Sequence, residues 1–195
     1  MVIFITGGAR SGKSRFAEAL AGRLSLNGEG DYIATAQLYD NEMEERARLH
    51  RQRRAESGFR WRLHEEPYEL AALLAERSAR FREGETGGVI LIDCLTLWLS
   101  NWLLKLEREE RLDRLEAKIE ELSAALADCP MPVLAVSNEV GDGIVPEYEL
   151  GRLFRDYAGL LGQRIARLSD RAFLVTAGIP VDLKRLEFKL DDWER

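Results

Sequence analysis

Short apolar runs alternate along the chain with longer stretches in which apolar residues recur every three or four positions. The apolar runs are VIFIT (2–6), YIAT (32–35), GVILID (88–93), PVLAVS (132–137) and AFLVTA (172–177). These runs are β-branched or continuously apolar, which is typical of strands buried on both faces of a sheet. The periodic stretches predict helices near residues 13–25, 40–56, 67–82, 95–128 and 147–168. The alternation predicts an α/β fold, a mostly parallel sheet covered by helices on both faces.

The remaining segments indicate a single domain over residues 1–195, because the sequence contains no linker, repeat or low-complexity stretch. REGETGG (82–88) is predicted to be a surface loop, and the polar tail EFKLDDWER (187–195) is expected to be loosely attached. Trp98 and Trp102 stand four positions apart, which predicts a helix with one buried face. No apolar run approaches the roughly 20 residues that span a bilayer.

A phosphate-binding motif directly follows the first predicted strand. GGARSGKS (7–14) fits the pattern G-x-x-x-x-G-K-[ST], with Gly7, Gly12, Lys13 and Ser14 in register. The glycines let backbone N–H groups face phosphates, and the next helix directs its positive N-terminus at them. In this pattern the lysine reaches the β- and γ-phosphates and the serine binds Mg²⁺. A strand before the motif and a helix after it favour nucleotide binding over a chance turn.

Two further strand ends carry polar residues. Asp93 ends GVILID, which is the Walker B arrangement that places a carboxylate near Mg²⁺; alternatively, it caps the next helix. We favour the metal role because the phosphate loop belongs at the same carboxyl edge of the sheet. Asn138 and Glu139 follow the strand at 132–137, either in a substrate-contacting loop or in an ordinary turn. The stretch NEVG is not the N-K-x-D element that recognises guanine.

Composition narrows the functional classes. Hydrophobic residues make up 46% and charged residues 32% of the chain, with a net charge of -6, which is typical of a soluble protein and disfavours nucleic-acid binding. Cys94 and Cys129 lack metal-ligand spacing, and Cys94 lies in an apolar run, so we expect reduced thiols in a cytoplasmic protein. The N-terminal MVIFIT is too short for the apolar region of a signal peptide.

The segment EERARLHRQRR (44–54) surrounds one of only two histidines with five arginines. On a helix, His50 shares a face with Arg46, Arg53 and Arg54. The arginines are candidates for a mobile lid that clamps phosphates. Alternatively, His50 is a nucleophile that attacks a nucleotide phosphorus, since nearby cations disfavour imidazolium and keep the ring neutral. A solvated surface helix is the third interpretation.

Seven motifs together resemble one enzyme family. In order they are GGARSGKS, YIATA, DNEMEERARLH, W…EEP, LIDCLTLWLSN, SNEVGDGIVP and TAGIP. Their order and spacing are similar to those of the bifunctional adenosylcobinamide kinase / adenosylcobinamide-phosphate guanylyltransferase family of cobalamin biosynthesis. The resemblance extends from residue 1 to about residue 186, and the segments after the phosphate loop are its most specific part.

The resemblance implies two reactions on a corrinoid. The enzyme phosphorylates the aminopropanol hydroxyl of adenosylcobinamide with ATP or GTP, then transfers GMP from GTP through a GMP–histidine intermediate. By motif position that histidine is His50, with Lys13 as the other catalytic residue. The resemblance also implies a RecA-like P-loop fold and a homotrimer, for which the apolar Trp98 and Trp102 helix is a candidate contact, although core packing explains that helix equally well.

The resemblance further assigns nucleotide contacts, with Mg²⁺ at Ser14 and Asp93. The implied contacts are Gly7, Gly8, Ala9, Arg10, Ser11, Gly12, Lys13, Ser14, Ala34, Thr35, Ala36, Arg51, Gln52, Arg53, Arg54, Glu65 and Asp93. Glu65 is assigned by its place after Trp61, because the stretch between His50 and Trp61 is slightly longer than the family pattern. Glu66 is its rival, and His64 is off-pattern and expected at the surface.

Two other functions remain compatible with the motifs alone. One is a monofunctional P-loop kinase of another metabolite, with residues 46–54 as an arginine lid and no covalent step. The other is a RecA-like nucleic-acid ATPase. The acidic charge and the lack of basic loops with interleaved aromatic residues argue against the second.

Overall fold

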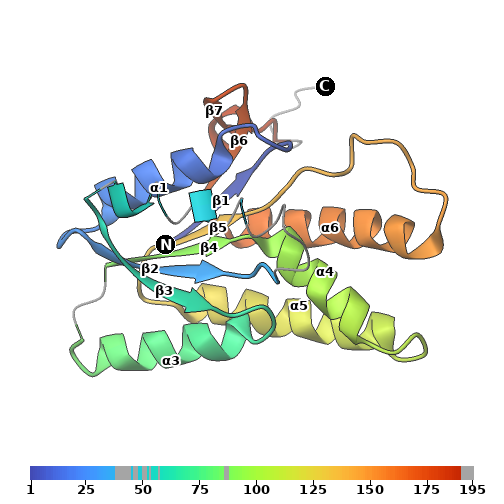
Figure 1. Ribbon diagram of the computed structural model, residues 1–195, viewed down its shortest axis with the longest axis horizontal. Coiled ribbons are helices and arrows are strands. Elements are labelled where there is room, and N and C mark those ends of the chain that lie inside the picture. Colours follow the sequence, from blue (N-terminus) through green and yellow to red (C-terminus); the bar gives the residue numbers. More distant parts are fainter. Residues whose placement is uncertain are drawn as a thin grey trace.

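The computed structural model describes residues 1–37, 45, 48–49, 52, 54–56, 58–85 and 88–189 of the chain. Within these residues, seven strands form one sheet in the order β3-β2-β4-β5-β1-β6-β7 (Figure 1). The strands are β1 (Val2–Thr6), β2 (Glu29–Ala34), β3 (Arg60–Glu65), β4 (Val89–Asp93), β5 (Val133–Val136), β6 (Arg171–Thr176) and β7 (Ile179–Asp182). Neighbouring strands are parallel except for the β6–β7 hairpin, so the predicted mostly parallel sheet is confirmed.

Helices cover both faces of this sheet, as predicted, but unequally. They are α1 (Lys13–Leu24), α3 (Leu70–Arg82), α4 (Leu95–Lys105), α5 (Arg111–Asp128), α6 (Glu149–Leu168) and α7 (Leu183–Leu186). In Figure 1, α1 lies on one face of the sheet, and α3, α5 and α6 lie on the other. Tyr32 belongs to the apolar cluster on the α1 face, and Ile33 belongs to the cluster on the opposite face. This alternation is what a strand buried on both sides produces.

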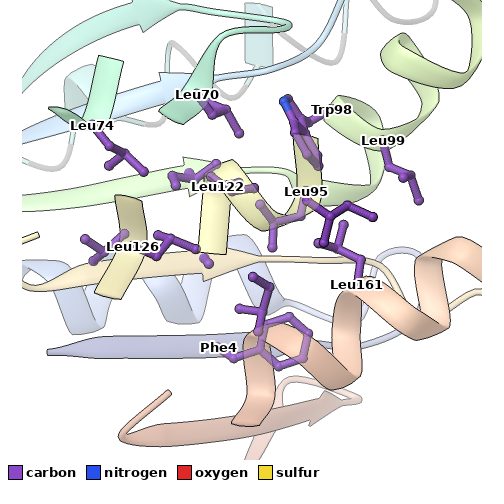
Figure 2. Close-up of a cluster of buried hydrophobic side chains, with 14 of the residues drawn as sticks. Phe4, Leu70, Leu74, Leu95, Trp98, Leu99, Leu122, Leu126 and Leu161 are labelled. Carbon is purple, nitrogen blue, oxygen red and sulfur yellow. The ribbon is translucent and has the colours of Figure 1, made fainter. Parts of the chain in front are cut away.

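The larger core lies between the sheet and the helices α3 to α6. Figure 2 shows its side chains converging from these elements, including Phe4, Leu74, Leu122 and Leu161. The tryptophans of α4 are buried in the same cluster, and both indoles donate hydrogen bonds to the Tyr68 carbonyl, at 2.7 and 3.0 Å. Packing within the chain therefore accounts for the apolar surface of α4, without a contact to a second subunit.

The five predicted strands are confirmed to within a few residues, but two strands were not predicted. β3 alternates exposed and half-buried residues and carries three charged side chains, and β7 is largely exposed. Edge strands are commonly polar in this way, so they lack the apolar run that identifies a central strand. The single helix expected over 95–128 is wrong, because α4 ends at Lys105 and α5 begins at Arg111.

Three remaining segments complete the comparison with the sequence. Most of the helix expected near 40–56 lies outside the described residues. In the loop and tail, residues 83–85 and 187–189 have no regular structure, and the other tail residues, 190–195, lie outside the described part. No helix among the described residues has both the length and the apolar character needed to cross a membrane.

The strand register brings three chain segments to one edge of the sheet. Ala34 is paired with Asp93, and Asp93 with Val136, while Ile5 of β1 also pairs with Val136. The four parallel strands therefore end at the same level, and the loops that follow them meet there. Ligands bind at this carboxyl edge in open α/β sheets.

Candidate nucleotide site

The loop between β1 and α1 has the backbone that a phosphate-binding loop requires. Gly12 adopts a left-handed conformation with φ 95° immediately before α1. A Cβ atom at Gly7 would lie 2.4 Å from the Val175 carbonyl oxygen, and one at Gly12 would lie 3.2 Å from the Cα of Gly178. The loop also accepts a hydrogen bond at the Ser11 carbonyl from the Gly178 amide, at 2.8 Å. Both glycines are thus required by the close packing of this loop on β6 and the β6–β7 turn.

Lys13 lies inside the same loop rather than in solvent. Its side chain is buried, and Nζ donates a hydrogen bond to the Gly8 carbonyl at 3.0 Å. Ser11 Oγ is buried and has no hydrogen-bond partner among the described residues. A buried ammonium, a buried hydroxyl and the N-terminus of α1 together favour an anion at this position.

Asp93 lies at the end of β4 and is bound by a buried tyrosine. The Tyr32 hydroxyl donates to Asp93 Oδ2 at 2.8 Å. Burial, and after it the charge of Asp93, raise the pKa of Tyr32 well above its usual value, so the phenol stays protonated and acts as the donor. The N-cap position of α4 is occupied by Cys94 without a side-chain capping bond. The geometry therefore favours a carboxylate oriented at the sheet edge over a helix cap.

Thr35 links the end of β2 to the end of β4. Its hydroxyl donates to the Cys94 carbonyl at 2.7 Å and accepts from the Cys94 amide at 2.8 Å. The Thr35 carbonyl accepts a hydrogen bond from Asn101 Nδ2 at 2.8 Å. Because Thr35 is fully buried, its side chain fixes the position of the loop that carries Ala34 and Ala36 beside Asp93.

The loop after β5 joins the same edge. Asn138 Nδ2 donates to Thr96 Oγ1 at 3.0 Å, and the Glu139 amide donates to the Gly7 carbonyl at 3.0 Å. Cys94 Sγ lies 3.2 Å from Thr96 Oγ1. Burial and the charge of Asp93 raise the pKa of the Cys94 thiol to about 11, so it remains protonated at neutral pH. Both cysteines are buried and unpaired, which confirms the reduced thiols expected from sequence.

The structure distinguishes the two glutamates after β3 by their hydrogen bonds. Glu66 Oε1 accepts from the Tyr68 amide at 2.9 Å and from the Glu69 amide at 2.8 Å, which fixes the turn into α3. Glu65 is exposed and is paired with Ala34 at the sheet edge. The carboxylate of Glu66 is therefore occupied by the turn, whereas that of Glu65 extends from the edge where the loops meet.

We expect substitutions of these glutamates to separate stability from binding. Glu66→Ala removes a carboxylate that binds two backbone amides, so it should lower the free energy of unfolding by about 1 kcal/mol and leave nucleotide affinity unchanged. Glu65→Ala should weaken nucleotide binding without changing stability. Urea denaturation and calorimetric titration with GTP measure the two effects. The reverse pattern would identify Glu66 as the contact.

The histidine segment is described only in part. His50, Arg51 and Arg53 lie outside the described residues. Gln52 is exposed, and its Nε2 donates to Glu56 Oε1 at 3.0 Å. The Arg54 guanidinium lies over the Tyr32 ring, 3.7 Å from its centroid, and the residue is only 8% exposed. The far end of this segment therefore packs on the α1 face of β2, next to the residue that holds Asp93.

The expected surface position of His64 is wrong. His64 is half-buried on β3, and its Nε2 lies 2.8 Å from Oδ1 of Asp31 on β2. The two side chains point to the face covered by α3, where Arg77 also contacts Asp31. The polar sequence of β3 concealed this arrangement because its neutralising partner is 33 residues away.

The oxygen donors at the edge fit Mg²⁺ bound together with a nucleotide. Within the described part of the chain, no group of three or more His, Cys, Asp or Glu side chains is placed to hold a metal. Mg²⁺ seldom uses such a cage and instead takes one or two protein oxygens together with water and substrate phosphates. The Ser14 hydroxyl and the Asp93 carboxylate are donors of this kind.

Sequence reasoning missed three residues that organise the site: Tyr32, Thr96 and Asn101. Each is a polar side chain inside an apolar run and is buried in the structure. Polar groups in such positions require hydrogen-bond partners, which is a usable signal. The signal does not identify the partner, and these residues bond to segments between 34 and 66 residues away.

Comparison with known proteins gives the family. The family model described as "Cobinamide kinase / cobinamide phosphate guanyltransferase" matches residues 3–183. The chain belongs to this family. The resemblance inferred from the motifs is thereby confirmed over nearly the whole length that it was expected to cover.

Curated relatives support the assignment along their full length. The "Bifunctional adenosylcobalamin biosynthesis protein CobP" of Pseudomonas aeruginosa is 46% identical over 180 residues, covering 92% of this chain and 95% of the relative. The "Bifunctional adenosylcobalamin biosynthesis protein CobU" of Escherichia coli K12 is 41% identical over 193 residues, covering 94% of this chain and 100% of the relative.

A solved structure supports the fold class. A crystallised ATPase domain superimposes with a TM-score of 0.50 at 13% identity, covering 89% of this chain and 68% of that one. At this identity the likeness shows the fold alone. The expected RecA-like P-loop fold is confirmed.

Proposed function

We propose that this chain phosphorylates adenosylcobinamide with ATP or GTP and then transfers GMP from GTP to adenosylcobinamide phosphate, through a covalent intermediate on His50. The observation that carries the proposal is the phosphate loop beside Asp93 at one sheet edge, in a member of the cobinamide kinase / cobinamide phosphate guanyltransferase family. The curated relatives are named as bifunctional, which supports both activities in one chain.

In the kinase step, the chain binds and orients the triphosphate. The backbone N–H groups of residues 7–14 and the Lys13 ammonium offset its negative charge, and Ser14 and Asp93 are placed for the metal. Bound Mg²⁺ would supply further neutralisation of the phosphate oxygens. The corrinoid hydroxyl oxygen then bonds to the γ-phosphorus as the bond to the bridging oxygen breaks, which releases the nucleoside diphosphate.

In the second step, a neutral nitrogen of His50 attacks the α-phosphorus of GTP. A nitrogen–phosphorus bond forms, the bond to the bridging oxygen breaks, and pyrophosphate leaves. A phosphate oxygen of adenosylcobinamide phosphate then attacks the same phosphorus and releases His50. The arginines at 51 and 53 are proposed to offset the charge on the attacked phosphate.

Further nucleotide contacts are proposed at the loop after β2, residues 34–36, at Gln52 and Arg54, and at Glu65. Residues 34–36 and Glu65 are supported by the strand pairing that sets Ala34 beside both Asp93 and Glu65. The occupied carboxylate of Glu66 also supports Glu65 as the contact. For Arg54 the described geometry shows a contact with Tyr32, which is developed below.

The proposal predicts where each phosphate of GTP is found. With adenosylcobinamide, label from the γ-phosphate should reach the corrinoid first, and label from the α-phosphate should follow. Without corrinoid, α-label should be retained on the protein in an acid-labile, alkali-stable form, as expected for a phosphoramidate. Chromatography of the corrinoids and denaturing gels measure these outcomes. Kinase activity without any α-label would instead indicate a monofunctional kinase.

We also propose a homotrimer. Several large apolar side chains are exposed, among them Ile144 at 97% and Phe188 at 62%, which supports contact with another copy. Light scattering on a sizing column should give a mass near three times 22.2 kDa. A mass equal to one chain at micromolar concentration would contradict this proposal.

A further inference from the structure

Tyr32 connects two parts of the molecule that serve different steps of the proposed reaction. Its hydroxyl donates to Oδ2 of Asp93 at 2.8 Å, and its ring lies under the guanidinium of Arg54 at 3.7 Å. The ring is also held on edge by Trp61, with centroids 5.6 Å apart and planes at 84°. One buried side chain therefore touches the carboxylate at the phosphate-loop edge and the end of the histidine segment.

Each contact in this chain of residues is short and largely shielded from water. Tyr32 is 4% exposed and Arg54 is 8% exposed. A hydrogen bond to a carboxylate and a cation over an aromatic face are both stronger when desolvated. The hydroxyl fixes the orientation of Asp93, and the ring fixes the position of Arg54, which is four residues after His50. A shift at either end must therefore be accommodated by the same side chain.

We propose that Tyr32 is a positioning residue that couples nucleotide binding at Asp93 to the placement of the segment that carries His50. The proposal rests on the proposed function only for the role of His50, since the coupling itself is a property of binding. In this arrangement Arg54 acts on the nucleotide through Tyr32 and Asp93 rather than by touching a phosphate. Because coupling between two sites is reciprocal, the nucleotide must in turn stabilise the Arg54 end of the segment.

A double-mutant cycle distinguishes indirect action from direct contact. The measured quantity is the dissociation constant of a non-hydrolysable GTP analogue with Mg²⁺, by calorimetric titration. Tyr32→Phe removes the hydroxyl and keeps the ring, whereas Arg54→Gln removes the cation. Each substitution alone should weaken binding by roughly five-fold or more. In the Tyr32→Phe background, Arg54→Gln should weaken it further by only about two-fold or less.

The opposing outcomes are defined by the same cycle. If Arg54→Gln weakens binding equally in both backgrounds, Arg54 contacts the nucleotide directly and the proposal is overturned. Unchanged binding in both single variants would also overturn it. Lys105→Gln is the matched control, because it removes another cation stacked on an aromatic ring, 4.0 Å from the Tyr68 centroid, and should leave binding unchanged. Circular dichroism and thermal unfolding verify that each variant folds.

Amide hydrogen exchange provides a second test that does not need Tyr32→Phe to fold. Binding of the analogue with Mg²⁺ should slow exchange at residues 54–56 in the wild type and leave it unchanged in Arg54→Gln. Protection that persists in Arg54→Gln would overturn the coupling. Both tests are made without turnover, so a protein that shows the coupling but gains no label from α-labelled GTP would refute the proposed function alone.

Discussion

Replacing His50 with alanine is expected to abolish the covalent GMP adduct and to lower guanylyl transfer by about a thousand-fold or more, while phosphorylation of adenosylcobinamide stays near the wild-type rate. Loss of a nucleophile removes the only bond through which the intermediate forms, and such losses are among the largest in enzyme mutagenesis. The kinase step relies on Lys13, Ser14 and Asp93, which belong to β1–α1 and β4 rather than to the histidine segment.

The measurement follows the two phosphates of GTP separately. Protein-bound α-label is counted on a denaturing gel, and the phosphorylated and guanylylated corrinoids are separated by chromatography. Accumulation of the phosphorylated corrinoid without the guanylylated product is the expected result for His50→Ala.

The second histidine of the chain provides the matched control. His64 is bound to Asp31 on the α3 face of the sheet, so His64→Gln should retain the label even if the protein is somewhat less stable. A label that survives in His50→Ala, or that disappears in His64→Gln, would contradict the assignment of His50.

The part of the fold that could be predicted is the part encoded locally. β1, the phosphate loop and β4 were identified because a continuous apolar run, a glycine pattern and a terminal carboxylate each lie within a few residues. β3 was missed because its side chains are acceptable only next to particular partners. Arg62 and His64 would suit a surface loop, and they become strand residues because the buried Asp31 neutralises them.

The break between α4 and α5 was missed for a similar reason. Residues 105–111 are largely good helix formers, so the local sequence does not indicate an end. In the structure the Arg111 guanidinium binds the Leu106 carbonyl, at 3.0 and 3.2 Å, and this contact turns the chain. A tertiary arrangement has overridden the local preference.

The site divides in the same way. The phosphate loop, Asp93 and the positions of Thr35 and Glu65 were accessible to motif reasoning. The contacts that orient them were not, because Tyr32 and Asp93 are 61 residues apart and Thr35 and Cys94 are 59 apart. Pairing at such separations is set by strand order, and the sequence of a single chain does not specify that order.

The second large effect is expected at Asp31, a buried carboxylate behind the site. Asp31 is 1% exposed and accepts hydrogen bonds from Arg62 at 3.0 Å and from Arg77 at 3.2 Å, besides its contact with His64. Glu85 binds the same two arginines, at 2.6 and 2.7 Å. These contacts join β2, β3 and α3, so the network fixes the edge strand that ends at the proposed nucleotide contact.

Asp31→Ala should lower the free energy of unfolding by about 3–5 kcal/mol, because it leaves the buried charge of Arg77 with less compensation. For a chain of this length the melting temperature should fall by roughly 10 °C. Glu29→Ala is the matched control on the same strand, since its ion pair with Arg60 is exposed and should contribute about 1 kcal/mol or less. Equal losses in the two variants, measured by urea denaturation, would refute the special role of Asp31.

A double substitution separates the cost of an unpaired charge from the value of the network itself. Replacing both members of a buried ion pair with apolar residues is commonly neutral or stabilising, whereas removing one member is not. Asp31→Leu combined with Arg77→Met should therefore recover most of the stability lost in Asp31→Ala, because Arg62 and His64 are partly exposed and can reach water. If the double variant is as unstable as the single one, the network stabilises the protein beyond charge compensation, and the pairing of β2 with β3 depends on these ionic contacts themselves.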